Sequence, residues 1–211
     1  MFDLFRYQTA DGREPFTDWL NSLRDRQAKA RILARLERLE AGNFGDCEPC
    51  REGVSEFRIH WGAGYRVYHA RGGQDGYPAS RRRRQAHAGC RHRPVGGLFA
   101  GLQEEAEMSK LKATVSHRNK LIEELRADPK LAREYLAAAI EDDDPRVLLA
   151  ALRTVAEMRG MARVAEAAGI PRESLYRTLS PKGNPRLSTL LAVIKAAGFR
   201  LSLDERKRRA A

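Results

Sequence analysis

The chain has 211 residues, of which 42% are hydrophobic and 32% are charged. This length suits one or two compact domains of roughly 100 to 200 residues each, and the composition is that of a folded soluble protein. No apolar run approaches the ~20 residues that cross a bilayer, and residues 1–15 lack the features of a secretory signal. We therefore expect a cytoplasmic protein with no membrane contact. Its three cysteines do not indicate a disulfide framework.

The net charge of +11 is concentrated in the second half of the chain. Residues 1–75 carry 12 basic and 12 acidic groups, whereas residues 108–211 carry 21 basic and 13 acidic groups. Because each neutralised phosphate releases counterions, this excess favours a polyanionic partner for the second half. Charge alone does not distinguish DNA from RNA or from an acidic protein.

The first segment, residues 1–75, has the pattern of a small sheet with one helical layer. Alternating apolar residues predict a strand over residues 3–7. Apolar residues three or four apart then predict a helical hairpin from Phe16 to Gly42, with Asp25 as a cap. Residues 54–69 alternate again on both sides of a glycine-rich turn, which predicts a β-hairpin. A segment of ~75 residues has a marginal core of its own.

Residues 76–107 are predicted to be a basic, irregular linker. They contain several glycines and prolines, four successive arginines at positions 81–84, and almost no apolar periodicity. Such a composition cannot bury enough apolar surface to fold. The four arginines are interpreted as a solvated tether, with a nucleic-acid contact as the alternative.

The pattern is helical from residue 108 to the end of the chain. Residues 121–125 form one short apolar face. Pro129 and Pro145 suit the first turns of the next two helices, and the second of these should end near Gly160. The sequence therefore predicts an all-helical domain over residues 108–211.

Residues 161–180 have the pattern of a helix-turn-helix. Gly169 can adopt the positive φ that a sharp turn between helices needs, and Pro171 suits the start of the second helix. In this motif the second helix enters the major groove of DNA. The alternative is a helix pair of an ordinary bundle. The residues expected to face inward are Val164, Ala165, Ala168, Ile170, Leu175 and Leu179.

The outward residues of the second helix are candidates for DNA contact. Arginine can pair with guanine or phosphate, serine can bond either, and tyrosine can reach a phosphate. A polar turn follows, with a lysine and an asparagine placed for contact with the DNA backbone. The candidate DNA-binding residues are Arg172, Glu173, Ser174, Tyr176, Arg177, Lys182 and Asn184.

Residues 108 to about 203 resemble the HigA family of addiction-module antidotes, which are Cro/repressor-type DNA-binding antitoxins. The resemblance is carried by VAEAAGIPRESLYR, from Val164 to Arg177, and by LSPKGNP, from Leu179 to Pro185. It implies a homodimer that binds double-stranded operator DNA, represses its own operon and neutralises a cognate RelE/HigB-like toxin.

Residues 1 to about 71 resemble that partner, the phage-derived RelE/HigB-like toxins, which are small ribonucleases that cut mRNA on the ribosome. The matching strings are GVSEFRIH, beginning at Gly53, and GAGYRVY, beginning at Gly62. Such an enzyme must activate a 2′-hydroxyl and stabilise a pentacoordinate phosphate, so it needs basic side chains on one sheet face. The resemblance assigns Arg58 and Arg66 to this role, if the strand register places them together. It makes His60 a candidate general acid or base, with packing or a surface hydrogen bond as the alternative.

The chain departs from the toxin pattern after residue 71. A further apolar strand, a Gly-Gly-x-Lys turn and a C-terminal helix are absent from the sequence there. One choice of codons for residues 76–80, read one base later, encodes Val-Ile-Leu-Leu-Leu, and a similar shift over residues 101–106 gives a toxin-like Asp-Tyr-Lys-Lys-Lys ending. Our hypothesis is a one-base frameshift near codon 76 that fused a truncated, inactive toxin to an antitoxin whose own start was Met108.

Three alternatives remain. The first half could be an active RelE-like ribonuclease inhibited in cis, with mRNA or the ribosome as its partner. It could instead be an interaction module of a single-chain regulator. Zinc binding is a third possibility, because Cys47 and Cys50 have a C-x-x-C spacing and three later residues, His87, Cys90 and His92, could complete a site. We expect no metal and no cofactor. The predicted fold is an α+β, RelE-like partial sheet with a helical hairpin, followed by an all-α helix-turn-helix domain.

Overall fold

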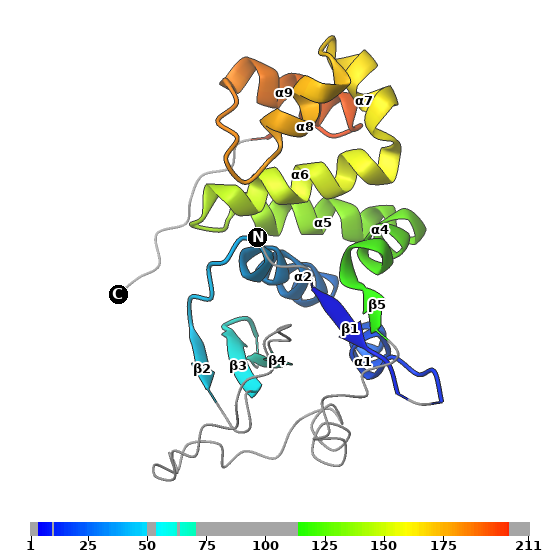
Figure 1. The fold of residues 1–211 in the computed structure, drawn as a ribbon, viewed down its shortest axis with the longest axis vertical. Coiled ribbons are helices and arrows are strands. Elements are labelled where there is room, and N and C mark those ends of the chain that lie inside the picture. The colour runs from blue at the N-terminus through cyan, green and yellow to red at the C-terminus, as the bar shows by residue number, and fades with distance from the viewer. Residues whose placement is uncertain (1–3, 10, 50–53, 63, 71–113, 203–211) are drawn as a thin grey trace, which may run out of the picture.

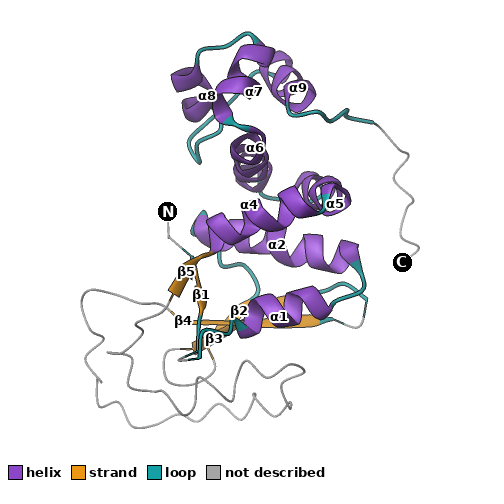
Figure 2. Ribbon diagram, turned by 90° about the vertical axis from the view of Figure 1, so that its right-hand side faces the viewer, coloured by secondary structure: helices purple, strands orange, loops and turns teal. Residues whose placement is uncertain are grey.

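The computed structural model describes residues 4–9, 11–49, 54–62, 64–70 and 114–202, and it has an α+β fold with a helical C-terminal region. The strands and α1 lie at one end of the molecule, α2 lies next to them, and α4 to α6 separate α2 from α7 to α9 at the other end (Figure 1, Figure 2). The elements are β1 (Phe5–Tyr7), α1 (Pro15–Ser22), α2 (Arg26–Glu40), β2 (Cys47–Pro49), β3 (Val54–Ile59), β4 (Tyr65–Ala70), β5 (Thr114–Ser116), α4 (His117–Ala127), α5 (Pro129–Ile140), α6 (Pro145–Arg159), α7 (Met161–Ala168), α8 (Arg172–Thr178) and α9 (Leu187–Ala196).

The expected helices are confirmed, and their ends are set by caps that the sequence contains. Asp25 accepts hydrogen bonds from the backbone N–H groups of Gln27 and Ala28 at the start of α2. Asp128 and Asp144 do the same at the starts of α5 and α6, each directly before a proline. Such caps satisfy donors that a helix N-terminus otherwise leaves unpaired.

The expected β-hairpin is confirmed as β3 and β4, which form a three-stranded antiparallel sheet in the order β2-β3-β4. Phe57 and Val67 are cross-strand partners and are both buried. Strand β3 packs on α2, so this apolar face of the sheet is covered by the helical hairpin. The third strand, β2, was not predicted, because Cys47-Glu48-Pro49 has no apolar alternation.

The expected first strand is also present, but its partner was not predicted. Strand β1 pairs antiparallel with β5, a strand in the segment that was expected to be helical throughout. The buried Arg6 of β1 explains the pairing. Its guanidinium donates to both carboxylate oxygens of Glu124, at 2.5 and 3.0 Å, and to Nδ1 of His117 at 3.1 Å. A buried guanidinium requires such partners, and α4 supplies both of them.

Helix α2 joins the two halves of the chain into one apolar core. It packs on β3 and also on α5 and α6, so that it is buried on both sides. On the side of α5 and α6 lies Glu37, which accepts hydrogen bonds from the hydroxyl of Tyr135 and, at 3.2 Å, from the hydroxyl of Thr154. The two halves that the sequence suggested therefore dock on each other.

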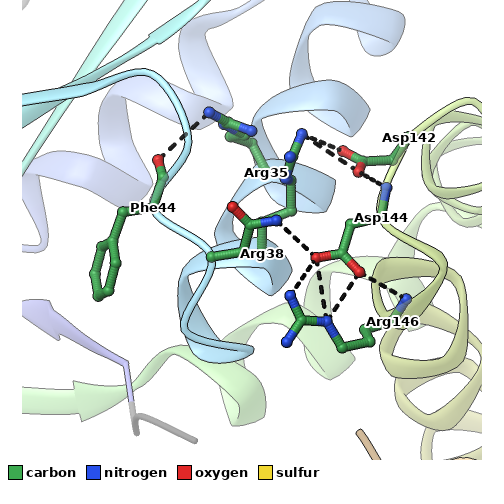
Figure 3. A network of polar contacts seen from close by, with 7 residues as sticks. Arg35, Arg38, Phe44, Asp142, Asp144 and Arg146 are labelled. Carbon is green, nitrogen blue, oxygen red and sulfur yellow. Dashed lines mark hydrogen bonds and ion pairs between the residues drawn. The ribbon is translucent and has the colours of Figure 1, made fainter.

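Ion pairs and hydrogen bonds surround this shared core. Figure 3 shows the network where the loop after α2 meets the turn between α5 and α6. The Asn43 amide donates to Asp144 at 2.8 Å, and Arg38 lies 3.4 Å from Asp142. A hydrogen bond from Arg146, helped by that from Asn43, holds the pKa of Asp144 well below its usual range. Further along α2, Arg26 pairs with Asp128 and Arg31 with Glu141.

Some of the predictions lie outside the described residues. These are the linker over 76–107, its arginines 81–84, the out-of-frame segment and the Met108 start of the second half. Within the described ranges, no helix is long and apolar enough to span a membrane.

We predict that His117 makes the fold sensitive to mild acid. Burial, with the charges of Arg6 and Arg118, lowers its pKa from 6.5 to about 3. Below pH 6.5 the unfolded chain therefore binds a proton at His117, whereas the folded chain does not. The contribution of neutral His117 to the free energy of unfolding is thus fully present above pH 6.5 and is lost as the pH falls. Between about pH 7.5 and about pH 5 the loss should be about 2 kcal/mol.

Urea unfolding at these two pH values measures the effect. The His117→Gln variant keeps an acceptor for Arg6 but does not titrate, so its stability should change less between the two pH values. Equal pH dependence in both proteins would contradict the prediction.

Candidate nucleic-acid interface

Helices α7 and α8 are joined by a tight turn centred on Gly169. Gly169 has φ 67°, in the left-handed region, and its N–H bonds to the carbonyl of Glu166. The N–H of Ile170 donates to the carbonyl of Ala165 at 3.1 Å, which closes the end of α7. Pro171 directly precedes α8 as its N-cap, one position earlier than a first helical residue. A glycine at the turn and a proline at the helix start allow this sharp reversal.

The inward side of this helix pair agrees with the sequence pattern. Val164 and Ala165 of α7 are buried, as are Leu175 of α8 and Leu179 directly after it. Ala168 and Ile170 are half-buried and pack against the same core. The pair is therefore anchored through these residues, and the opposite side of α8 faces outward.

The candidate DNA-binding residues lie on that outward side and in the turn that follows. Arg172, Glu173, Arg177, Lys182 and Asn184 are exposed, and Ser174 and Tyr176 are half-buried. Two pairs form along the helix: Arg172 donates to the hydroxyl of Tyr176, and Arg177 donates to that of Ser174, each at 3.4 Å. The hydrogen bond with Tyr176 raises the pKa of Arg172.

One residue beside this surface was missed by the sequence analysis. The guanidinium of Arg153, on α6, lies 5.7 Å from the centre of the Tyr176 ring. Its Nε donates to Glu157 at 3.2 Å, and Glu157 also accepts from Arg118 of α4 at 2.7 Å. No local motif marks Arg153, because it reaches Tyr176 only through the packing of α6 beneath the turn.

The candidate ribonuclease residues lie on the other sheet face, opposite to α2. Arg58 and Arg66 are cross-strand partners in β3 and β4, so the register does place them on one face. Between them lies Glu56, a buried residue that the sequence analysis did not single out. Its carboxylate accepts from Nε of Arg58 at 2.9 Å and lies 3.9 Å from Arg66.

Arg58 is engaged by carboxylates on this face. Besides the bond to Glu56, its two terminal nitrogens donate to Glu48 of β2, one of them at 3.2 Å. The hydrogen bond to Glu56, together with Glu48, raises the pKa of Arg58. His60 lies after the end of β3, 80% exposed, with Nε2 3.0 Å from Asp46. His60 is thus paired with Asp46 at the surface, and this contact does not connect it to Arg58 and Arg66.

No group of three potential metal ligands occurs among the described residues. The sulfur of Cys47 lies 3.8 Å from Nε2 of His69. The other proposed zinc ligands, Cys50, His87, Cys90 and His92, lie outside the described residues.

The helical C-terminal region is similar to antidotes of addiction modules. Residues 117–205 match the family described as "Probable addiction module antidote protein". This match covers the C-terminal region alone, and it supports an antitoxin role for that region.

Two relatives from Haemophilus influenzae, each described only as an uncharacterized protein, are similar to parts of the chain. One is 51% identical over 53 residues, which are 25% of this chain and 54% of the relative. The other is 37% identical over 71 residues, which are 34% of this chain and 73% of the relative. The chain thus spans about half the length of the first relative. No solved structure matches it significantly.

We predict that the turn after α8 requires Gly183. A Cβ at this position would collide with the backbone carbonyl oxygen of Thr178 and lie 2.9 Å from that of Ser180. Gly183→Ala should therefore displace the turn that carries Lys182 and Asn184 and lower the free energy of unfolding by about 1–3 kcal/mol.

Chemical denaturation and the backbone amide NMR shifts of Lys182 and Asn184 test this. Gly169→Ala is the matched control. A Cβ at position 169 would have no atom within 4 Å. The Gly169→Ala change should therefore lower the free energy of unfolding only by the strain of a positive φ, about 1–2 kcal/mol, and leave the later turn in place. A Gly183→Ala protein as stable as the original would show that the turn tolerates a side chain.

Proposed function

We propose that this protein is a single-chain toxin–antitoxin fusion whose antitoxin half is a DNA-binding transcriptional repressor. Residues 108–211 form the antitoxin half, and the helix-turn-helix over residues 161–180 reads operator DNA. Residues 1–75 are a RelE/HigB-like toxin half without ribonuclease activity, and residues 76–107 link the two. The protein acts as a homodimer in the cytoplasm.

One observation carries the DNA-binding part of the proposal. Helix α8 begins at a turn that projects it from the core, buries Leu175 and exposes Arg172 and Arg177. A short helix held on one side and cationic on the other fits the major groove, where arginine can pair with guanine. The antidote-family match over the same residues favours this function over an ordinary helix pair.

The inactivity of the toxin half is supported by the charges around Arg58. A cation that stabilises a phosphate must be able to offer its N–H groups to it. Here the guanidinium of Arg58 is already paired with Glu48 and Glu56, and only Arg66, at 3.9 Å from Glu56, is loosely held. The sheet face therefore presents little uncompensated positive charge to an RNA backbone.

A second candidate function is favoured by the docking of the halves. Because α5 and α6 cover one side of α2, the antitoxin half binds the toxin half within one chain. The contact does not cover Arg58 and Arg66, which lie on the sheet face opposite to α2, so inhibition of a competent ribonuclease site in cis would act through α2 and the sheet. The two candidates differ in whether loosening the contact releases activity.

We predict that Arg177→Ala weakens binding to operator DNA by about 1–3 kcal/mol, the cost of losing one base contact. Fluorescence anisotropy with labelled DNA from upstream of the gene measures the affinity. Arg133→Ala is the matched control, since Arg133 is an exposed arginine of α5 away from α8 and its loss should leave the affinity unchanged. An unchanged affinity in the Arg177 variant would remove this residue from the interface.

We also predict that the full chain does not cleave mRNA on translating ribosomes, because Arg58 is neutralised within its own sheet. Primer extension on a translated message detects cleavage. Cleavage that is abolished by Arg66→Ala would contradict this prediction. Cleavage that appears only after the Glu37 contact is weakened by Tyr135→Phe would favour inhibition in cis.

A further inference from the structure

The ring of Tyr176 lies between two arginines that come from different helices. Arg172, four residues earlier on α8, has its guanidinium 5.6 Å from the ring centre, and Arg153 of α6 has its own at 5.7 Å. Both distances are within the range of a cation–π contact. Arg172 moves with α8, whereas Arg153 belongs to the core helix beneath it. The Arg153 contact is therefore the one that can fix the ring relative to the body of the protein.

Arg153 is itself held in place. Its Nε donates to one carboxylate oxygen of Glu157, and the other oxygen accepts from Arg118. The side chains of Arg153, Glu157 and Arg118 are 27%, 20% and 22% exposed, so solvent only partly screens the two ion pairs. A carboxylate that bridges two guanidinium groups restricts the rotamers of both. Arg153 is thus a pre-ordered support for the Tyr176 ring.

The hydroxyl of Tyr176 is suited to bind a phosphate. It accepts a hydrogen bond from Arg172 at 3.4 Å, which leaves its O–H group able to donate. A phosphate oxygen placed beside it would receive the tyrosine O–H and the positive charge of Arg172 together. Fixing the ring before DNA arrives removes the entropy cost of ordering it at the moment of binding.

We propose that Arg153 is a positioning residue for DNA binding, which holds Tyr176 so that its hydroxyl meets a phosphate of the DNA backbone. The inference rests on the proposed DNA-binding function and adds a residue outside the helix-turn-helix to it. Arg153 acts through Tyr176 and does not contact the DNA.

A double-mutant cycle in the full chain tests this role. Tyr176→Phe keeps the ring and its packing but removes the hydroxyl, and Arg153→Ala removes the support. Each change should weaken operator binding about fivefold, the size expected for one cation–π or hydrogen-bond contact. The double variant should be no weaker than either single variant, because Arg153 has nothing left to position. Multiplied losses in the double variant would overturn the proposal.

The salt dependence of binding gives a second readout. If Arg153 touches no phosphate, Arg153→Ala should leave the slope of log affinity against log salt unchanged. A slope smaller by about one would mean that Arg153 neutralises a phosphate itself, which would also overturn the proposal.

A measurement without DNA separates this inference from the proposed function. The aromatic NMR signals of Tyr176 should shift in Arg153→Ala, and they should not shift in Arg133→Ala. Unchanged Tyr176 signals would overturn the positioning role, whatever the protein binds. If the Tyr176 signals shift as expected in Arg153→Ala but the unmutated chain binds no DNA, the proposed function is overturned, and the phosphate contact with it.

Discussion

The burial of α2 on two sides is the constraint on which the rest of the structure depends. A helix usually has one apolar stripe, but α2 is apolar toward both β3 and the helices α5 and α6. Without these two layers, buried leucines of α2 such as Leu33 and Leu36 would be exposed to water. The small sheet, marginal by its size, is stabilised because α2 gains a second layer from α5 and α6.

This arrangement also buries the carboxyl group of Glu37. Burial raises the pKa of Glu37, although hydrogen bonds from Tyr135 and Thr154 and the charge of Arg118 act in the opposite direction. Both hydroxyls bond to the same carboxylate oxygen, Oε1, and they offset part of the cost of burying this group.

How much of this was readable from the sequence differs between elements. Helix ends, the β-hairpin and the turn at Gly169 are local, because capping aspartates, prolines and glycines act within a few residues. The pairing of β1 with β5 was not predictable, because it depends on Arg6 finding Glu124 and His117 more than a hundred positions away. For the same reason, the pattern placed Arg172 and Arg177 on the exposed face but could not reveal Arg153 of another helix beneath Tyr176. Glu56, by contrast, is two residues from Arg58 on one strand, so strand alternation alone places it on the same face.

The packing of α2 against α5 and α6 also gives the molecule an uneven charge distribution, which matters for the proposed DNA binding. Three acidic residues of the C-terminal region that lie near α2, namely Asp128, Glu141 and Asp142, are paired with arginines of α2. At the other end, α7 to α9 and the turns between them expose cations with few acidic neighbours: Arg163, Arg172, Arg177, Lys182, Arg186 and Lys195. Helix α2 thus pairs carboxylates that would otherwise repel a phosphate backbone, and the exposed positive charge gathers at the end formed by α7 to α9.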